Sequence, residues 1–311
     1  MLKDKIEKLK KEKDVVILAH NYQIPEVQDI ADFVGDSLGL ARQAAKTNHK
    51  TILFCGVHFM AETAAIISPE KKVLIPDAAA GCSLSDSITL EQLKKWKKEH
   101  PHALAVGYVN TTAEIKSELD YCCTSSNAIN IVKSIPDDKE ILFLPDMFLG
   151  SYVAKATGRK NMLIWAGECH VHAGITPEDV KEKLNSLENA EFLIHPECSC
   201  TTPMMYDVAN GSYNSNQVQI LSTEGMMNHV KNSKSNEFVV ATETGILYRM
   251  KQQNPTKKFI PASEKAECEY MKMITLDKVY NSLLNDTTIV TVPKETADKA
   301  RLAIERMLAI N

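Results

Sequence analysis

The segment KKVLIPDAAAGCSLSDSITLEQLKKW, residues 71–96, recurs as KNMLIWAGECHVHAGITPEDVKEKL at residues 160–184 and as KKFIPASEKAECEYMKMITLDKVYNSL at residues 257–283. In each copy a short apolar run precedes a cysteine, and an Ile-Thr pair follows it at the same distance. Each Thr precedes an amphipathic stretch with an acidic residue in its first turn, which predicts an N-capped helix. A repeat at this spacing indicates three copies of one structural unit.

Apolar runs upstream of the cysteines extend the repeat. The runs that end at His20, Tyr108 and His195 lie 62, 61 and 73 residues before the cysteines, so the third copy has about eleven extra residues, which we place within 200–216. Each copy is expected to form strand, helix, helix, strand, helix, strand, cysteine and linker helix. Apolar strands separated by helices predict an α/β fold of three pseudo-threefold-related units, each a short parallel sheet flanked by helices.

The repeat also predicts the domain boundaries. The first α/β unit is expected to span residues 1–85, the second 86–172 and the third 173–275. The C-terminal segment 276–311 is expected to complete the first unit. Within it we predict a strand at 288–293 and an amphipathic helix from about Lys294 to Ile310.

Composition excludes several classes of protein. The net charge is −4, with 44% hydrophobic and 24% charged residues, so the chain is predicted to bind neither nucleic acid nor an anionic membrane. Its apolar runs are much shorter than the roughly 20 residues that span a bilayer. The first residues, MLKDKIEKLKKEKD, have no apolar core of a signal peptide. We therefore expect a cytoplasmic protein.

Three of the eight cysteines, Cys82, Cys169 and Cys268, occupy the same register of the repeat. Ligands of open α/β sheets bind beyond the carboxyl ends of the strands, where these cysteines are expected to lie. If the three units meet with those ends inward, the three thiols converge. Three thiolates can hold zinc with an open position, or a [4Fe–4S] cluster with one iron free of protein ligands. The repeat alone leaves both metals open.

Polar residues are expected at the same edge of the sheets. His20, Tyr108 and His195 end equivalent strands, and three hydroxyl residues, Ser37, Ser125 and Thr223, precede equivalent helices. The hydroxyls can be plain helix N-caps, or they can mark helix N-termini that bind phosphate or carboxylate. Further candidates for this cleft are Tyr22, Asn110, His172 and Glu197. Imidazole, phenol, amide and carboxylate together suit acid–base chemistry.

These motifs resemble those of the quinolinate synthase family. The resemblance rests on HNYQ at 20–23, GDS at 35–37, GYVN at 107–110 and HPEC at 195–198, together with PDAAAGCS, GECHVH and AECEYMKMITL around the three repeat cysteines. It implies three pseudo-symmetric domains and a [4Fe–4S] cluster on three cysteines. It also implies a transferase of NAD biosynthesis, which condenses iminoaspartate with dihydroxyacetone phosphate to quinolinate, phosphate and two waters. A functional link to L-aspartate oxidase or aspartate dehydrogenase would supply the iminoaspartate.

The resemblance assigns roles position by position. The cluster ligands would be Cys82, Cys169 and Cys268. The phosphate and carboxylates of the substrates would be held by His20, Ser37, Asn110, Ser125, His195 and Thr223. Proton transfers would involve Tyr22, Tyr108, His172 and Glu197, with Glu197 the main acid–base group. Some longer family members carry a CxxCxxC tract near the C-terminus, whereas this chain has only Cys268 there.

Three alternatives remain at this stage. The same three-cysteine cluster could serve another hydro-lyase that acts on a small anionic acid. The cysteines could hold zinc, which would give a colourless and air-stable enzyme. Finally, the chain could be a non-enzymatic iron–sulfur carrier, although carriers usually complete the cluster with a fourth protein ligand.

Overall fold

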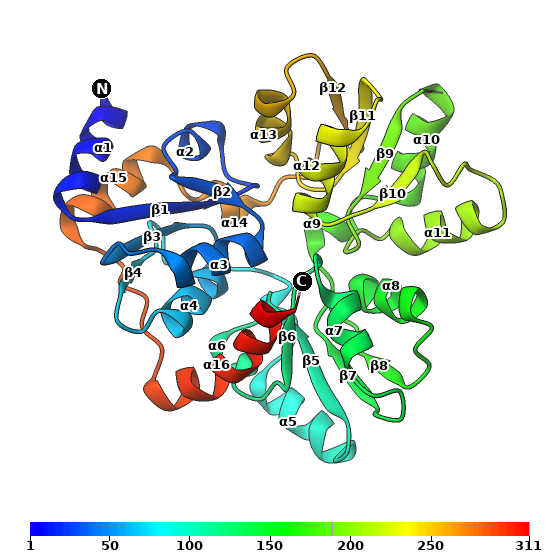
Figure 1. The fold of residues 1–311 in the computed structure, drawn as a ribbon, viewed down its shortest axis with the longest axis horizontal. Helices are drawn as coiled ribbons and strands as arrows, with labels where there is room; N and C mark the ends of the chain where they lie inside the picture. Colours follow the sequence, from blue (N-terminus) through cyan, green and yellow to red (C-terminus); the bar gives the residue numbers. More distant parts are fainter. Residues whose placement is uncertain (188, 311) are drawn as a thin grey trace.

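The computed structural model describes residues 1–187 and 189–310. It contains three four-stranded sheets, all parallel and flanked by helices, arranged around a common centre (Figure 1). This architecture confirms the predicted α/β fold of three similar units. The boundaries at residues 85/86 and 172/173 stay predictions.

The strand order is the same in every sheet. In the first sheet it is β2-β1-β3-β4, in the second β6-β5-β7-β8, and in the third β10-β9-β11-β12. The strands of the first sheet are β1 (Val15–His20), β2 (Phe33–Gly35), β3 (Thr51–Cys55) and β4 (Lys72–Leu74). Those of the second are β5 (Leu104–Tyr108), β6 (Tyr121–Cys123), β7 (Ile141–Leu144) and β8 (Met162–Ile164). Those of the third are β9 (Glu191–Ile194), β10 (Val218–Ile220), β11 (Glu237–Ala241) and β12 (Lys258–Pro261).

The prediction of three strands per unit was wrong, because each sheet has a fourth strand at one edge. These strands, β2, β6 and β10, have three residues each and lie between the two helices that were predicted to follow one another. Strands β4 and β8 are equally short but were predicted, because each belongs to a run of large apolar residues. The missed segments FVG, YCC and VQI contain glycine, cysteine or glutamine and form no such run.

Short and long helices connect the strands. They are α1 (Leu2–Glu12), α2 (Pro25–Gln28), α3 (Ser37–Lys46), α4 (His58–Ile67), α5 (Leu90–Glu99), α6 (Ala113–Lys116), α7 (Ala128–Ser134), α8 (Met147–Thr157), α9 (His170–Ala173), α10 (Pro177–Ser186), α11 (Thr201–Ala209), α12 (Thr223–Asn232), α13 (Ile246–Gln253), α14 (Glu269–Lys272), α15 (Leu276–Asn285) and α16 (Lys294–Ala309). Helix α11 and the turn after it contain the extra residues of the third unit.

The three linker helices α5, α10 and α15 confirm the predicted caps. Each follows a threonine whose hydroxyl accepts a hydrogen bond from a backbone N–H of the first turn, namely Thr89, Thr176 and Thr275. Helices α5 and α10 lead to the next unit, whereas α15 returns to the first unit and packs beside α1. The chain thus forms the three units in order and returns to the first one.

The C-terminal segment differs from its prediction. The expected strand at 288–293 is absent from the described structure, and only one antiparallel bridge joins Ile289 to Leu74 at the edge of the first sheet. Helix α16 confirms the predicted helix. It packs on α3 and α4 of the first unit and on α6 and β6 of the second, so that it lies across both (Figure 1).

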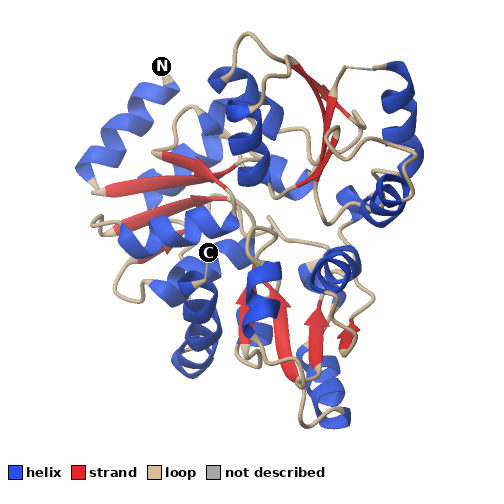
Figure 2. Ribbon diagram, turned by 45° about the vertical axis from the view of Figure 1, so that its right-hand side comes forward, coloured by secondary structure: helices blue, strands red, loops and turns tan. Residues whose placement is uncertain are grey.

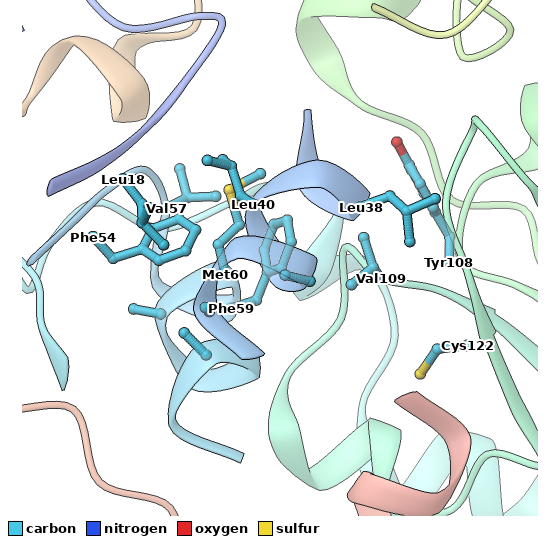
Figure 3. Packing of buried hydrophobic residues seen from close by; sticks show 14 of the residues in the cluster. Leu18, Leu38, Leu40, Phe54, Val57, Phe59, Met60, Tyr108, Val109 and Cys122 are labelled. Atoms are coloured by element: carbon cyan, nitrogen blue, oxygen red, sulfur yellow. The ribbon is translucent and has the colours of Figure 1, made fainter. Parts of the chain in front are cut away.

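The buried core continues from the first unit into the second. Leu38 of α3 belongs to the same apolar cluster as Val109 and Cys122 of the second unit, and Figure 3 shows these side chains in one region. Across the described ranges, no helix combines the length and apolarity needed to cross a bilayer.

Candidate active site

The carboxyl ends of the three sheets surround one cavity, which is lined by residues of all three units. Figure 2 shows the three sheets in red. All thirteen residues selected from the sequence line this cavity: His20, Tyr22, Ser37, Cys82, Tyr108, Asn110, Ser125, Cys169, His172, His195, Glu197, Thr223 and Cys268. The structure therefore brings together every residue that the sequence placed in the site. The chemical role of each stays a prediction.

The cysteine loops have the same backbone geometry in all three units. In each unit the residue two positions before the cysteine accepts a backbone hydrogen bond from the segment that follows β3, β7 or β11. These bonds run from His58 N to Ala80 O (2.7 Å), from Met147 N to Gly167 O (2.8 Å) and from Thr244 N to Ala266 O (2.9 Å). The common register of the cysteines is thus a property of the fold as well as of the sequence.

Burial keeps the three thiols protonated in the absence of a metal. It raises the pKa of Cys82 to about 12, and it also raises the pKa values of Cys169 and Cys268. Only a thiolate binds metal strongly, so loading of this site has to displace the thiol protons.

Two acidic residues behind the cysteine loops were missed in the sequence. Glu243 is buried and accepts hydrogen bonds from Cys268 N (3.1 Å) and Gly245 N (2.7 Å), and its carboxylate pairs with Lys272 Nζ at 2.6 Å. Asp146 holds the equivalent position in the second unit and caps α8 through Leu149 N (2.6 Å). Each directly follows an apolar run of the repeat, 141–145 for Asp146 and 238–242 for Glu243, and this shared position was a signal that could have found them.

A carboxylic acid lies at the centre of the polar wall. Glu197 is buried, and burial raises its pKa to about 7, although a hydrogen bond donated by Tyr108 Oη opposes this rise. His195 Nδ1 lies 3.4 Å from Glu197 Oε1 without forming a hydrogen bond there. Burial holds the pKa of His195 well below its ordinary value, so this contact is not an ion pair.

The other two imidazoles are also neutral. Burial lowers the pKa values of both His20 and His172 to about 3. His20 Nδ1 accepts a hydrogen bond from Tyr22 N (3.2 Å), which leaves the proton of the neutral ring on Nε2. The ring of His172 stacks on that of His195 at 4.7 Å, and its Nε2 lies 3.5 Å from Tyr22 Oη. These side chains can exchange protons through hydrogen bonds.

The hydroxyl residues are not themselves the N-caps, as one interpretation of the sequence had allowed. Ser37 and Thr223 are the first residues of α3 and α12, whose caps are the preceding Asp36 and Ser222. Because a neighbour caps each helix, both hydroxyls are available to the cavity. Ser125 lies 3.2 Å from His195 Nε2, in the loop before α7.

Side chains from all three units also meet beside these hydroxyls, which sequence reasoning missed. Ser126 Oγ donates to Asp36 Oδ2 at 2.6 Å and lies 3.0 Å from Ser222 Oγ. Asn110 has a buried Oδ1 that lacks a hydrogen-bond partner within the described ranges. An unpaired buried amide oxygen in a cavity wall favours a polar ligand at this position.

A second arrangement of metal ligands exists in the same cavity. Ligand atoms of Cys169, His172 and Glu197 all lie within 4.8 Å of one another, close enough to hold a single ion. This group shares Cys169 with the three repeat cysteines, so both arrangements would use the same sulfur.

Comparison with known proteins identifies the family. The family described as Quinolinate synthetase A protein matches residues 4–309. The chain belongs to the quinolinate synthase family. The quinolinate synthase of a Thermus thermophilus strain is 53% identical over 309 residues, covering 99% of this chain and 97% of its own. That of Pyrobaculum aerophilum is 52% identical and covers 99% of both chains. That of Mycobacterium sp. KMS is 50% identical, covering 98% of this chain and 90% of its own.

Membership in the quinolinate synthase family makes this protein an enzyme of NAD biosynthesis. Among solved structures, the E-1-hydroxy-2-methyl-but-2-enyl-4-diphosphate reductase of Plasmodium falciparum aligns over 98% of this chain and 93% of its own, at 12% identity. Its TM-score of 0.27 is too low to establish a common fold.

Proposed function

We propose that this enzyme condenses iminoaspartate with dihydroxyacetone phosphate to give quinolinate, phosphate and two waters. The observation that carries the proposal is the convergence of three cysteines, three hydroxyls and a buried acid–base group in one cavity. We also propose that the units have the predicted boundaries, 1–85 with 276–311, 86–172 and 173–275.

A [4Fe–4S] cluster fits the three cysteines. Cys82, Cys169 and Cys268 are the cysteines among the described residues that line the cavity, and each comes from a different unit. Three sulfurs leave one iron of such a cluster without a protein ligand. When bound, the cluster supplies a Lewis acid that can hold a substrate oxygen and favour loss of water.

Other residues that line the cavity suit the anionic groups of the substrates. Ser37 and Thr223 lie at the first turns of α3 and α12, where free backbone N–H groups and the helix dipole favour phosphate or carboxylate. His20 contributes an Nε2 proton, and Ser125, His195 and Asn110 add polar atoms. We assign phosphate and carboxylate binding to these six residues.

Glu197 suits the proton transfers of a condensation with two dehydrations. A carboxyl group with a pKa of about 7 can take a proton from carbon in one step and return it to a leaving hydroxyl in another. Tyr108 donates to the carboxylate form and stabilises it. Tyr22 and His172 lie 3.5 Å apart at Oη and Nε2, close enough to relay a proton.

The deciding experiment uses protein purified without oxygen. Iron, sulfide and zinc are measured together with quinolinate formation from iminoaspartate and dihydroxyacetone phosphate. We expect about four irons and four sulfides per chain and quinolinate as the product. Zinc in place of iron would contradict the cluster and favour a zinc site, either on the three cysteines or at Cys169, His172 and Glu197. Absence of quinolinate from iron-loaded protein would favour a different hydro-lyase.

The source of iminoaspartate is a separate part of the proposal. We infer that L-aspartate oxidase or aspartate dehydrogenase supplies it. Adding either enzyme with aspartate to the assay should support quinolinate formation without added iminoaspartate. A requirement for preformed iminoaspartate in the presence of an active oxidase would contradict this link.

A further inference from the structure

A buried contact joins the first and third units beside the cavity. Asn21 directly follows β1 and is fully buried. Its Nδ2 donates to Thr223 Oγ1 at 3.2 Å, and its Oδ1 accepts from Arg249 Nη1 at 2.7 Å. Arg249 belongs to α13 and Thr223 to α12, so one amide of the first unit contacts two helices of the third.

Arg249 does not act as a clamp for substrate anions. It is absent from the cavity lining among the described residues, and its Nη1 also pairs with Glu224 Oε2 at 2.9 Å. Its charge is therefore balanced by a neighbour on α12. What remains for Arg249 is the hydrogen bond to Asn21.

This hydrogen bond fixes the orientation of the Asn21 amide. A guanidinium group only donates, so the amide oxygen of Asn21 has to face Arg249 and its NH₂ group has to face Thr223. The Thr223 hydroxyl oxygen therefore accepts a hydrogen bond from the amide, and one of its lone pairs is used in this contact. No other hydrogen bond of this hydroxyl occurs within residues 1–187 and 189–310. The hydroxyl proton of Thr223 is left to point into the cavity that the residue lines.

We propose that Arg249 and Asn21 are positioning residues, which fix Thr223 as a hydrogen-bond donor to an anionic oxygen of the substrate, a phosphate or a carboxylate oxygen. Because the contact crosses from the first unit to the third, the donor is set only while these units are docked. The inference rests on the proposed function, since it deepens the assignment of Thr223 to substrate binding. It gives roles to two residues outside the thirteen that the sequence selected.

An isosteric change at Asn21 inverts the polarity of the contact. Asn21→Asp keeps the shape and the partner Arg249 but replaces the NH₂ group by an acceptor oxygen. The Thr223 hydroxyl would then donate to this carboxylate and no longer to the substrate. Loss of one charge-assisted hydrogen bond predicts a roughly 10- to 150-fold rise in one KM, with a smaller change in kcat and with unchanged iron content. A rise in the KM of dihydroxyacetone phosphate would identify a phosphate oxygen, and a rise in that of iminoaspartate a carboxylate oxygen.

A double-mutant cycle separates positioning from mere structural support. Thr223→Val removes the donor and should raise the same KM by a similar factor. If Asn21 acts through Thr223, the double variant Asn21→Asp with Thr223→Val should lose nothing further. Arg249→Met, which frees the amide to rotate, should have a smaller effect on the same KM, and Arg249→Lys should restore binding because lysine also only donates.

The chain offers a matched control. Asn161 accepts from Arg159 Nε at 3.0 Å and donates to backbone carbonyls, but it does not line the cavity. Asn161→Asp therefore makes the same chemical change beside an arginine far from the substrate. It should leave both KM values unchanged.

Binding of inorganic phosphate and of quinolinate, measured by calorimetry, tests the inference without turnover. We expect at least one of these anions to bind more weakly to Asn21→Asp than to the wild type. Equal binding of both anions together with unchanged KM values, or additive losses in the double variant, would overturn the inference. If Asn21→Asp does not fold, equal KM values for Arg249→Met and Arg249→Lys would overturn it. If the wild type binds these anions but makes no quinolinate, the proposed function fails and the anion comparison still tests the donor.

Discussion

The three units contribute similar residues to one part of the cavity lining and different residues to another. We call these parts the cysteine wall, formed by the three cysteine loops, and the second wall. On the cysteine wall the three units are alike: each contributes a cysteine, the same backbone hydrogen bond two residues before it, and a threonine that caps the next helix. On the second wall, by which we mean the lining residues at the ends of the first strands, they differ. His20, Tyr108 and His195 occupy equivalent places, and only the third unit has a carboxylate, Glu197, two residues further on.

Under the proposed function, this difference separates the residues that would bind the cluster from those that would contact the substrates. Three equivalent sulfurs suit a group that presents equivalent faces to the three units. Two small substrates have no such symmetry, so the side chains that contact them have to differ from one unit to the next. We expect equivalent substitutions on the cysteine wall to have equal effects on activity in all three units. Equivalent substitutions on the second wall should have effects that differ from unit to unit.

The largest effect is expected for the cysteines. Cys82→Ala, Cys169→Ala and Cys268→Ala should each abolish iron binding and lower activity by at least about 10³-fold, because a Lewis acid contributes several kcal/mol. Iron content and the visible spectrum measure the outcome, with Cys122→Ala, outside the cavity lining, as the control. Metal loss confined to Cys169→Ala would break the predicted equivalence and favour the Cys169, His172 and Glu197 group.

The second-largest effect is expected for Glu197, where a substitution should lower activity without loss of iron. Glu197→Gln removes the buried acid–base group of the third unit while keeping its size. We expect kcat to fall by about 10²- to 10⁴-fold with iron content unchanged, since general acid–base catalysis contributes about this much. Steady-state kinetics and iron analysis of the same sample check it. A variant that retains wild-type kcat would remove Glu197 from the chemistry.

A third prediction concerns a pair of equivalent residues of different charge. Gln28 and Lys116 each lie eight residues after the strand-end residues His20 and Tyr108. Gln28 Nε2 donates to Gln23 O at 2.8 Å, and Lys116 Nζ donates to Thr111 O. Burial lowers the pKa of Lys116 from 10.5 to about 8, whereas Gln28 cannot titrate.

The sign of the pH effect follows from these pKa values. The unfolded chain binds more protons at Lys116 between pH 8 and 10.5, so wild-type stability should rise through this window relative to Lys116→Gln, by about 3 kcal/mol in total. Below pH 8 the difference between the two proteins should be constant. Urea denaturation at several pH values measures the free energy of unfolding of both proteins. If the two free energies changed in parallel between pH 8 and 10.5, Lys116 would have the same pKa in the folded and unfolded states, and the prediction would be wrong.

The smallest effect is expected for the helix caps. Thr89→Ala, Thr176→Ala and Thr275→Ala should each lower the free energy of unfolding by about 1 kcal/mol, because each leaves a backbone N–H of a first turn without its partner. Thermal denaturation measures it, and iron content should not change. Thr157→Ala serves as control, since that hydroxyl donates only within α8.

The repeat predicted most of the site because equivalent positions in the three copies can be recognised from their spacing along the sequence. The register of Cys82, Cys169 and Cys268 predicted three sheets and one shared cleft, and all thirteen selected residues line one cavity. Strand β2 was missed because its short segment, Phe33–Gly35, includes a glycine and forms no run of large apolar residues, whereas the equally short β4 belongs to such a run. The strand predicted at 288–293 reflected β-propensity alone, and at the edge of the first sheet the chain makes only a single bridge there.

Contacts between distant residues lay outside the reach of the sequence. Asn21 and Arg249 are separated by 228 residues along the chain, and no pattern links them. The contact of Ser126 with Asp36 and Ser222 arises from how the units dock, which spacing within a unit does not describe. A repeat predicts what the units share, and the docking of unlike surfaces has to be seen in three dimensions.

The position of each cysteine along the chain has a mechanical consequence. Cys82, Cys169 and Cys268 each come shortly before the linker helix that leaves their unit, and the third linker returns to the first unit. The segments that link the units therefore begin at the same cavity. A group bound by all three sulfurs would therefore cross-link the three units, and it would stabilise their arrangement as a whole.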